Sequence, residues 1–125
     1  MIAGAVNADH EAIIGLKVQG PSGQEQDIDA VIDTGFTGLL TLPPTIIQAL
    51  GLTWLTQSQA VLGNGQIETF DVFVATVVWD GQPIRIMVDE ANTDPLVGMA
   101  LMYGYDLHIQ NLDGGLVTIE RIVTP

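Results

Sequence analysis

The sequence predicts an all-β fold in a single domain that spans residues 1–125. Short runs rich in β-branched and aromatic residues alternate with turns that contain Gly, Asn, Asp or Pro, a rhythm typical of β structure. The composition is that of a globular protein, since 47% of the residues are hydrophobic and only 14% are charged. A chain of this length can bury a core of its own.

Four turns with the sequences of hairpin connections punctuate the chain, at residues 20–23, 63–65, 80–81 and 113–115. The strands expected on either side of them lie within residues 11–19, 24–33, 58–90 and 106–123. Residues 70–79 are apolar on both faces, which is typical of a central, well-covered strand.

One or two short helices are expected besides the strands. The first follows the pair Pro43-Pro44, where a helix can start, and Gly51 provides its C-terminal stop. The second is expected at residues 99–103, directly after a short strand that contains Leu96 and Val97.

The charge of the chain excludes several partners. Three basic residues face 15 acidic ones, and the formal net charge is -12. Because no basic footprint exists, neither nucleic acid nor an anionic membrane is an expected partner. No secretory signal and no apolar run of membrane-spanning length is found, so we expect a soluble, cytoplasmic protein.

Metal and cofactor chemistry is not expected. The chain has no Cys, and its two histidines, His10 and His108, have no partner at metal-ligand spacing. Asp89, Glu90 and Asp94 lack the Gly-containing pattern of a calcium loop, and they are expected to form a solvated acidic loop.

The candidate catalytic stretch is Asp33-Thr34-Gly35, which follows the apolar run Ala30-Val31-Ile32. On its own the tripeptide favours an ordinary turn at the end of a strand. The apolar run changes this interpretation, because it predicts a carboxylate that emerges from the core. Thr34 can place a hydroxyl beside that carboxylate, and Gly35 offers an unobstructed N–H.

A single carboxylate cannot both activate water and protonate a leaving group, and the chain holds no second copy of the motif. A homodimer with its two-fold axis at this loop would pair Asp33 with its symmetry mate. Two such carboxyl groups share one proton, so one acts as base toward water and the other as acid toward a carbonyl. Activity is then expected at mildly acidic pH.

Three segments resemble the retropepsin-like (clan AA) aspartic proteases, in particular small bacterial members with the sequence D-T-G-F. "AVIDTG" matches the catalytic loop, "AVLGNGQIETFDVFVATV" lies where the flap hairpin belongs, and "PLVGMALM" matches the strand and helix of the second half. The third segment also echoes the first, because in each an apolar pair is followed by a Gly-containing loop. The resemblance covers most of the chain in order and implies a closed retropepsin-like barrel that works as a homodimer.

The resemblance also implies roles for individual residues. Asp33 would activate water, Thr34 would bond across the dimer, and Gly35 would line the site. Substrate and flap contacts would come from Phe36, Leu62, Gly63, Asn64, Gly65, Leu96, Val97 and Gly98. The substrate would be a peptide or protein bound as an extended strand under the flap.

Two departures from the viral enzymes stand out. Viral enzymes carry acids shortly after the catalytic Gly, whereas this chain has Phe36, Thr37 and Gly38 there. Many relatives carry an Arg after the later Gly, whereas here Met99 follows. Substrate contacts therefore need not carry over, and Phe36 either shapes a pocket or packs.

The favoured hypothesis is an aspartic endopeptidase without metal or cofactor. A dimeric peptide-binding or scaffolding module on the same fold is the alternative, and a chain that is monomeric in isolation is a third possibility. The hairpin within residues 106–123 either forms the dimer interface or closes the barrel.

Overall fold

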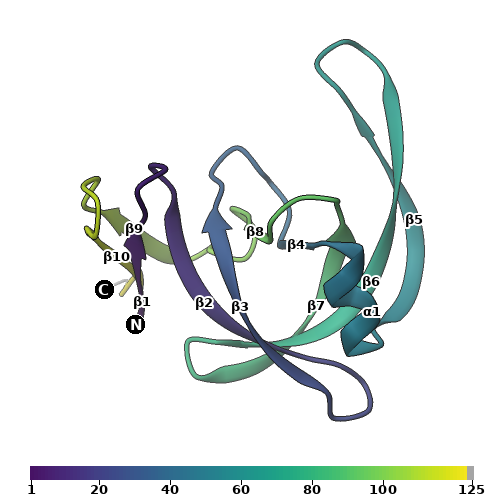
Figure 1. Cartoon of the computed structure of the whole chain (residues 1–125), viewed down its shortest axis with the longest axis horizontal. Coiled ribbons are helices and arrows are strands. Elements are labelled where there is room, and N and C mark those ends of the chain that lie inside the picture. Colours follow the sequence, from purple (N-terminus) through teal and green to yellow (C-terminus); the bar gives the residue numbers. More distant parts are fainter. Residues whose placement is uncertain (124–125) are drawn as a thin grey trace.

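The computed structural model describes residues 1–123 as ten strands and one short helix (Figure 1). In chain order these elements are β1 (Ile2–Val6), β2 (Ala12–Gln19), β3 (Glu25–Ile32), β4 (Leu40–Leu42), α1 (Pro44–Leu50), β5 (Thr53–Val61), β6 (Ile67–Trp79), β7 (Gln82–Glu90), β8 (Leu96–Val97), β9 (Tyr105–Ile109) and β10 (Leu116–Arg121).

Six of these strands form the predicted closed barrel. The hydrogen-bonded order is β2, β3, β8, β4, β7 and β6, and β6 pairs back onto β2. The second edge of β2 is shared, because its start pairs with β1 and its end pairs with β6. Two of the pairings, β3 with β8 and β4 with β7, are parallel, and the others in the ring are antiparallel.

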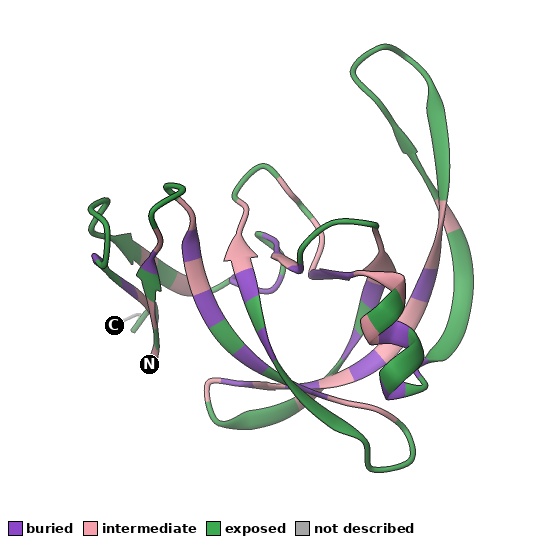
Figure 2. Cartoon of the chain, in the orientation of Figure 1, coloured by how far each residue is buried: buried purple, intermediate pink, exposed green. Residues whose placement is uncertain are grey.

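Strand β6 has the central position that its apolar sequence predicts. It pairs with β5, β7 and β2, and its barrel half buries Val72, Ala75, Val77 and Trp79. Its first residues leave the barrel together with β5 as a long, exposed hairpin (Figure 2).

Helix α1 begins and ends where the sequence predicts. Pro43 is its extended N-cap and Pro44 its first residue, so no lost N–H destabilises the first turn. Gly51 takes the left-handed conformation, with φ 59°, and its N–H donates to the last turn. The helix covers the core with Ile47 and Leu50.

The prediction of a second helix is wrong. Residues 99–103 form a series of turns, in which Leu101 N donates to Gly98 O three residues earlier. The Met99 and Ala100 amides donate instead to the carbonyls of Phe36 and Gly38. These long-range bonds fix the segment against another loop, and Gly104, with φ 86°, then turns the chain into β9.

The C-terminal hairpin, β9 and β10, lies beside the barrel (Figure 1). It does not close the barrel, because the β2–β6 pairing does so. Instead β10 pairs with β1, a strand that the sequence analysis did not predict. The described core runs from this sheet into the barrel and includes Ile14, Leu40, Val97, Val117 and Ile119, all fully buried.

Candidate active site

The loop that follows β3 holds Asp33 in one backbone geometry. Its N–H donates to Val97 O (2.9 Å), and its carbonyl accepts from Phe36 N (3.1 Å). The side-chain Oδ1 accepts a hydrogen bond from Gly35 N (2.9 Å). Asp33 is half-buried, so the carboxylate is anchored by the protein but still open to a ligand.

The two sequence segments that echo one another lie side by side. Val31 pairs with Leu96 and Ile32 with Val97 in the short parallel ladder of β3 and β8. Both strands therefore reach the same end of the barrel, and the loops that follow them meet there. Gly98 N donates to Leu39 O (2.9 Å), which ties the far side of the Asp33 loop to β8.

Phe36 packs against the backbone of both loops. A Cβ atom added to Gly38 would lie 2.6 Å from the Phe36 ring, and one added to Gly98 would also lie 2.6 Å from it. These distances are too short for a real Cβ, so the ring occupies space that only glycine leaves free. Of the two roles considered for Phe36, the structure therefore supports packing.

Thr34 is exposed at the tip of the loop. It lines a groove of about 410 Å³ that continues along Ile32 and the β1–β2 connection to Ile109 and Asn111 of the C-terminal hairpin. The β1–β2 connection and the C-terminal hairpin, which supply much of the groove's lining, lie on the side of the Asp33 loop away from the flap hairpin (Figure 1).

The predicted flap is an exposed hairpin with Gly63, Asn64 and Gly65 in its turn. Gly65 has φ 82° and donates to Leu62 O (2.9 Å), while the Asn64 side chain accepts from Gln66 N (2.9 Å). The hairpin rises at the end of the barrel that carries the Asp33 loop (Figure 1). Within residues 1–123, no hydrogen bond joins its tip to that loop, so the structure does not bring the flap residues and Asp33 together.

Asp89 is an acidic residue near the Asp33 loop, at the end of the strand region predicted within residues 58–90. Asp89 and Glu90 are half-buried at the end of β7, and only Asp94 of the expected acidic loop is in an exposed connection. The expectation of a solvated loop is therefore wrong for the first two. The signal was available, because the alternating apolar residues Ile84, Ile86 and Val88 carry the strand up to them.

The Asp89 carboxylate lies beside the Asp33 loop. Its Oδ2 atom is 3.5 Å from the position of a Cβ added to Gly38. Burial raises the pKa of the Asp89 carboxyl. The Asp89 side chain lines a cavity of about 400 Å³ between the loop before β8 and the flap stem, the part of β6 around Glu68 and Phe70.

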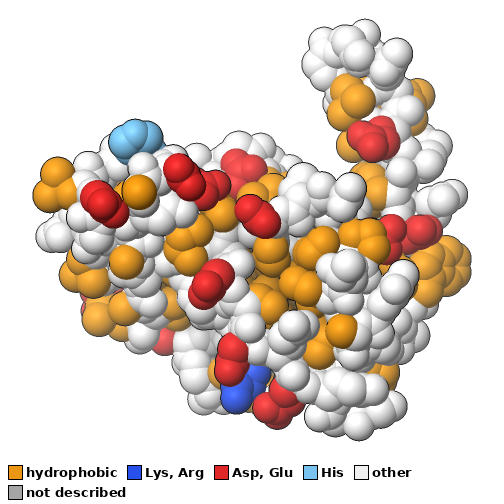
Figure 3. Space-filling view, viewed as in Figure 1, with side chains coloured by type: hydrophobic (Ala, Val, Ile, Leu, Met, Phe, Trp, Pro, Cys, Tyr) orange, Lys and Arg blue, Asp and Glu red, His pale blue; other side chains and the backbone are white. Residues whose placement is uncertain are grey.

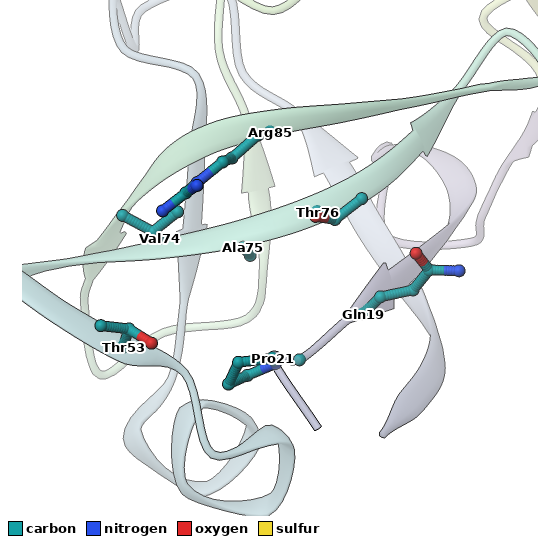
Figure 4. Close-up of a pocket in the computed structure, with 8 residues that line it drawn as sticks. Gln19, Pro21, Thr53, Val74, Ala75, Thr76 and Arg85 are labelled. Carbon is teal, nitrogen blue, oxygen red and sulfur yellow. The ribbon is translucent and has the colours of Figure 1, made fainter. Parts of the chain in front are cut away.

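A smaller cavity of about 210 Å³ lies at the other end of the barrel, next to the turn between β2 and β3 (Figure 4). Arg85 is the one ionisable side chain that lines it, among Thr53, Val74, Thr76 and other neutral residues. This cavity offers no acid–base pair and lies away from Asp33.

Comparison with known proteins identifies the architecture. The structure is similar to the crystal structure of a retropepsin-like aspartic protease from Rickettsia conorii, with a TM-score of 0.59 over 98% of this chain and 90% of that chain. The fold is retropepsin-like. Sequence identity in this match is 19%, so the likeness concerns the fold. No protein-family model matches the chain, and no curated protein matches it in sequence.

Two further observations concern the described part of the retropepsin-like chain. Within residues 1–123, no group of three or more His, Cys, Asp or Glu side chains is arranged to hold a metal ion. No helix in the same range has the length and apolar character needed to cross a bilayer.

Proposed function

We propose that the protein is a homodimeric aspartic endopeptidase of the D-T-G-F type, in which Asp33 of each chain contributes one half of the catalytic dyad. The observation that carries the proposal is the position of Asp33 in a retropepsin-like fold. Its carboxylate lies at the end of a barrel strand, hydrogen-bonded to Gly35 N at 2.9 Å and half-exposed.

The reaction follows from two carboxyl groups that share one proton. The ionised carboxylate removes a proton from a water molecule, and the water oxygen attacks the peptide carbonyl. The protonated carboxyl donates its proton to the carbonyl oxygen as the tetrahedral species forms, and collapse with protonation of the amine breaks the C–N bond. Since no second carboxylate of the same kind lies in the Asp33 loop, the second group comes from a partner chain.

The terminal strands limit where a partner chain can pair. β1 lies between β2 and β10, and β10 lies between β1 and β9, so both have two neighbours in the same chain. The free edge at this end of the sheet belongs to β9, which within residues 1–123 pairs with β10 alone. The exposed Thr34 and the groove beside it, which reaches Ile109 of β9, are the surface that we assign to the partner.

The flap hairpin supports a peptide substrate. Its outer half is exposed, including Val61, Leu62 and Ile67 (Figure 2). An exposed apolar hairpin at this end of the barrel can close over an extended peptide and exclude water from the dyad.

A cleavage assay tests the proposal. The wild-type protein should cleave a denatured protein mixture at mildly acidic pH, and an active-site-directed aspartic protease inhibitor should stop it. Asp33→Asn should lose at least about a thousandfold in rate while it keeps its fold, because the amide oxygen still accepts from Gly35 N. Sedimentation should give a dimer for both proteins. Unchanged cleavage by Asp33→Asn would refute the proposal.

A further inference from the structure

The cavity beside Asp89 has the walls of a side-chain pocket. It has a volume of about 400 Å³ and is open to the surface. Its lining comes from β4, the outer part of β6, the end of β7 and the loop before β8. It consists of Thr41, Glu68, Phe70, Asp89, Glu90, Ala91, Asn92 and Thr93. Such a volume accommodates one long side chain.

The position of the cavity connects it to the candidate active site. Glu68 and Phe70 belong to β6 where it leaves the barrel as the flap, and Asp89 lies against Gly38 of the Asp33 loop. A peptide strand bound between the flap and that loop therefore passes the mouth of this cavity. Side chains of such a strand alternate in direction, so one of them faces the cavity.

The chemistry of the walls selects the kind of side chain. Phe70 and Ala91 offer apolar surface, and Asp89 offers a carboxylate that has no hydrogen-bond donor or cation on it within residues 1–123. Burial raises the pKa of this carboxyl, and no neighbouring group within residues 1–123 offsets the cost of removing its charge from water. A side chain with an aliphatic stem and a cationic head would supply both the apolar contact and the missing charge.

Within residues 1–123, no basic side chain forms an ion pair with Asp89 and so competes with a substrate cation. The two ion pairs in residues 1–123, Met1 with Asp80 and Lys17 with Glu25, lie elsewhere. In Figure 3 acidic side chains are spread over the face that carries the flap, and blue basic surface is visible only near its lower edge. Glu68, Asp89 and Glu90 do not converge as metal ligands.

We infer that this cavity is a specificity pocket for a lysine or arginine side chain of the substrate, with Asp89 as the residue that selects the positive charge. The inference rests on the proposed function, because it takes the substrate to be a peptide bound under the flap.

The test compares Asp89→Asn with the wild-type protein on the same peptides. The bonds that each protein cleaves in a denatured protein mixture are identified by mass spectrometry. A cleaved sequence is then synthesised with Lys, Arg, citrulline, norleucine or Glu at the enriched position. Asp27→Asn is the control, because it removes the same charge from an exposed position at the far end of β3.

The wild-type protein should show enriched Lys and Arg at one position near the cleaved bond. Its kcat/KM for the Lys peptide should exceed that for the norleucine peptide by about tenfold or more, the effect of one charge-assisted hydrogen bond. Asp89→Asn should lose most of this ratio while it still cleaves the norleucine peptide, and Asp27→Asn should keep it.

Failure of the inference is distinguishable from failure of the proposed function. A wild-type protein that cleaves without basic preference, or an Asp89→Asn variant that keeps the preference, overturns the pocket and leaves the protease standing. If the wild-type protein cleaves nothing, calorimetry with an extended apolar octapeptide that carries one central Lys or one central norleucine decides. Tighter binding of the Lys octapeptide than of the norleucine octapeptide, lost in Asp89→Asn, supports the pocket, and equal binding overturns it.

Discussion

The Phe36 ring lies over Gly98, a residue from the other half of the chain, so that a Cβ on Gly98 would approach Phe36 Cδ2 to 2.6 Å. The same added atom would also collide with the Gly38 carbonyl oxygen. The loop after β3 and the loop after β8 are therefore packed so closely that residue 98 has no room for a side chain. This packing, together with the hydrogen bonds from the Met99 and Ala100 amides, holds the two loops against each other.

Replacement of Gly98 by Ala should destabilise the protein. The methyl group has to displace a backbone carbonyl and an aromatic ring, which costs about 1–3 kcal/mol of unfolding free energy. Gly15→Ala is the control, because an added Cβ there has nothing within 4 Å. Urea unfolding measures both, and equal stability of the two variants would contradict the packing described for Phe36.

Substitution of Gly65 should lower activity by more than its effect on stability explains. Gly65 and Gly81 both have positive φ, 82° and 79°, and open space around them. Gly65 is in the flap turn, whereas Gly81 is in the turn between β6 and β7. Gly65→Ala and Gly81→Ala should each destabilise their turn by about 1–2 kcal/mol, because alanine is strained at positive φ. Only Gly65→Ala should lower kcat/KM, by severalfold. A similar loss of kcat/KM in Gly81→Ala would contradict a specific role of the flap turn in activity.

Thr41 fixes the strand that supports Asp33. Its side chain is buried, and its Oγ1 accepts a hydrogen bond from Leu96 N at 3.1 Å. Thr41→Val leaves that amide without its partner and should cost about 1–3 kcal/mol of unfolding free energy. Thr41→Ser, which retains the hydroxyl, should recover most of this loss. Thermal or urea unfolding of the two variants measures it, and a Val variant as stable as the Ser variant would argue against the bond.

The stability of Asp89→Asn should depend on pH. Burial raises the folded-state pKa of Asp89 above the ordinary value of 3.8, so ionised Asp89 destabilises the folded state at neutral pH. The variant should therefore be slightly more stable than the wild-type protein near pH 7. The difference should fade as the pH drops from the folded-state pKa to below 3.8, where Asp89 is protonated in both states.

Melting temperatures of wild-type protein, Asp89→Asn and the exposed control Asp27→Asn, measured from pH 3 to pH 7, test this dependence. The control corrects for the stabilisation that follows from lower charge repulsion when any one of the many negative charges is removed. A gain for Asp89→Asn that does not exceed the control, or that grows towards low pH, would contradict the burial of the Asp89 carboxylate.

The elements with strong local signals were predictable from the sequence. Proline at the start and a glycine stop define α1, and Gly-containing turns define the hairpins at residues 63–65 and 80–81. The covered character of β6 was visible in its continuous apolar run, and the structure explains it by pairing with three other strands.

Features that depend on distant contacts were not predictable in the same way. Residues 99–103 have a helix-compatible composition, but the Met99 and Ala100 amides bond to the Phe36 loop and hold the segment in turns. β1 has few β-branched residues and exists because β2 and β10 supply partners on both edges. The approach of Asp89 to Gly38 follows from the parallel pairing of β4 and β7, for which the sequence carries no local signal.

The central claim is that two chains share one active site, and subunit mixing tests it most directly. Wild-type and Asp33→Asn chains are combined in equal amounts at fixed total concentration, allowed to exchange, and assayed for peptide cleavage. Random pairing leaves about one quarter of the dimers with two Asp33 residues, so activity should fall to about a quarter of that of the wild-type protein alone. Activity of one half would mean that each chain works by itself, and would contradict the shared dyad.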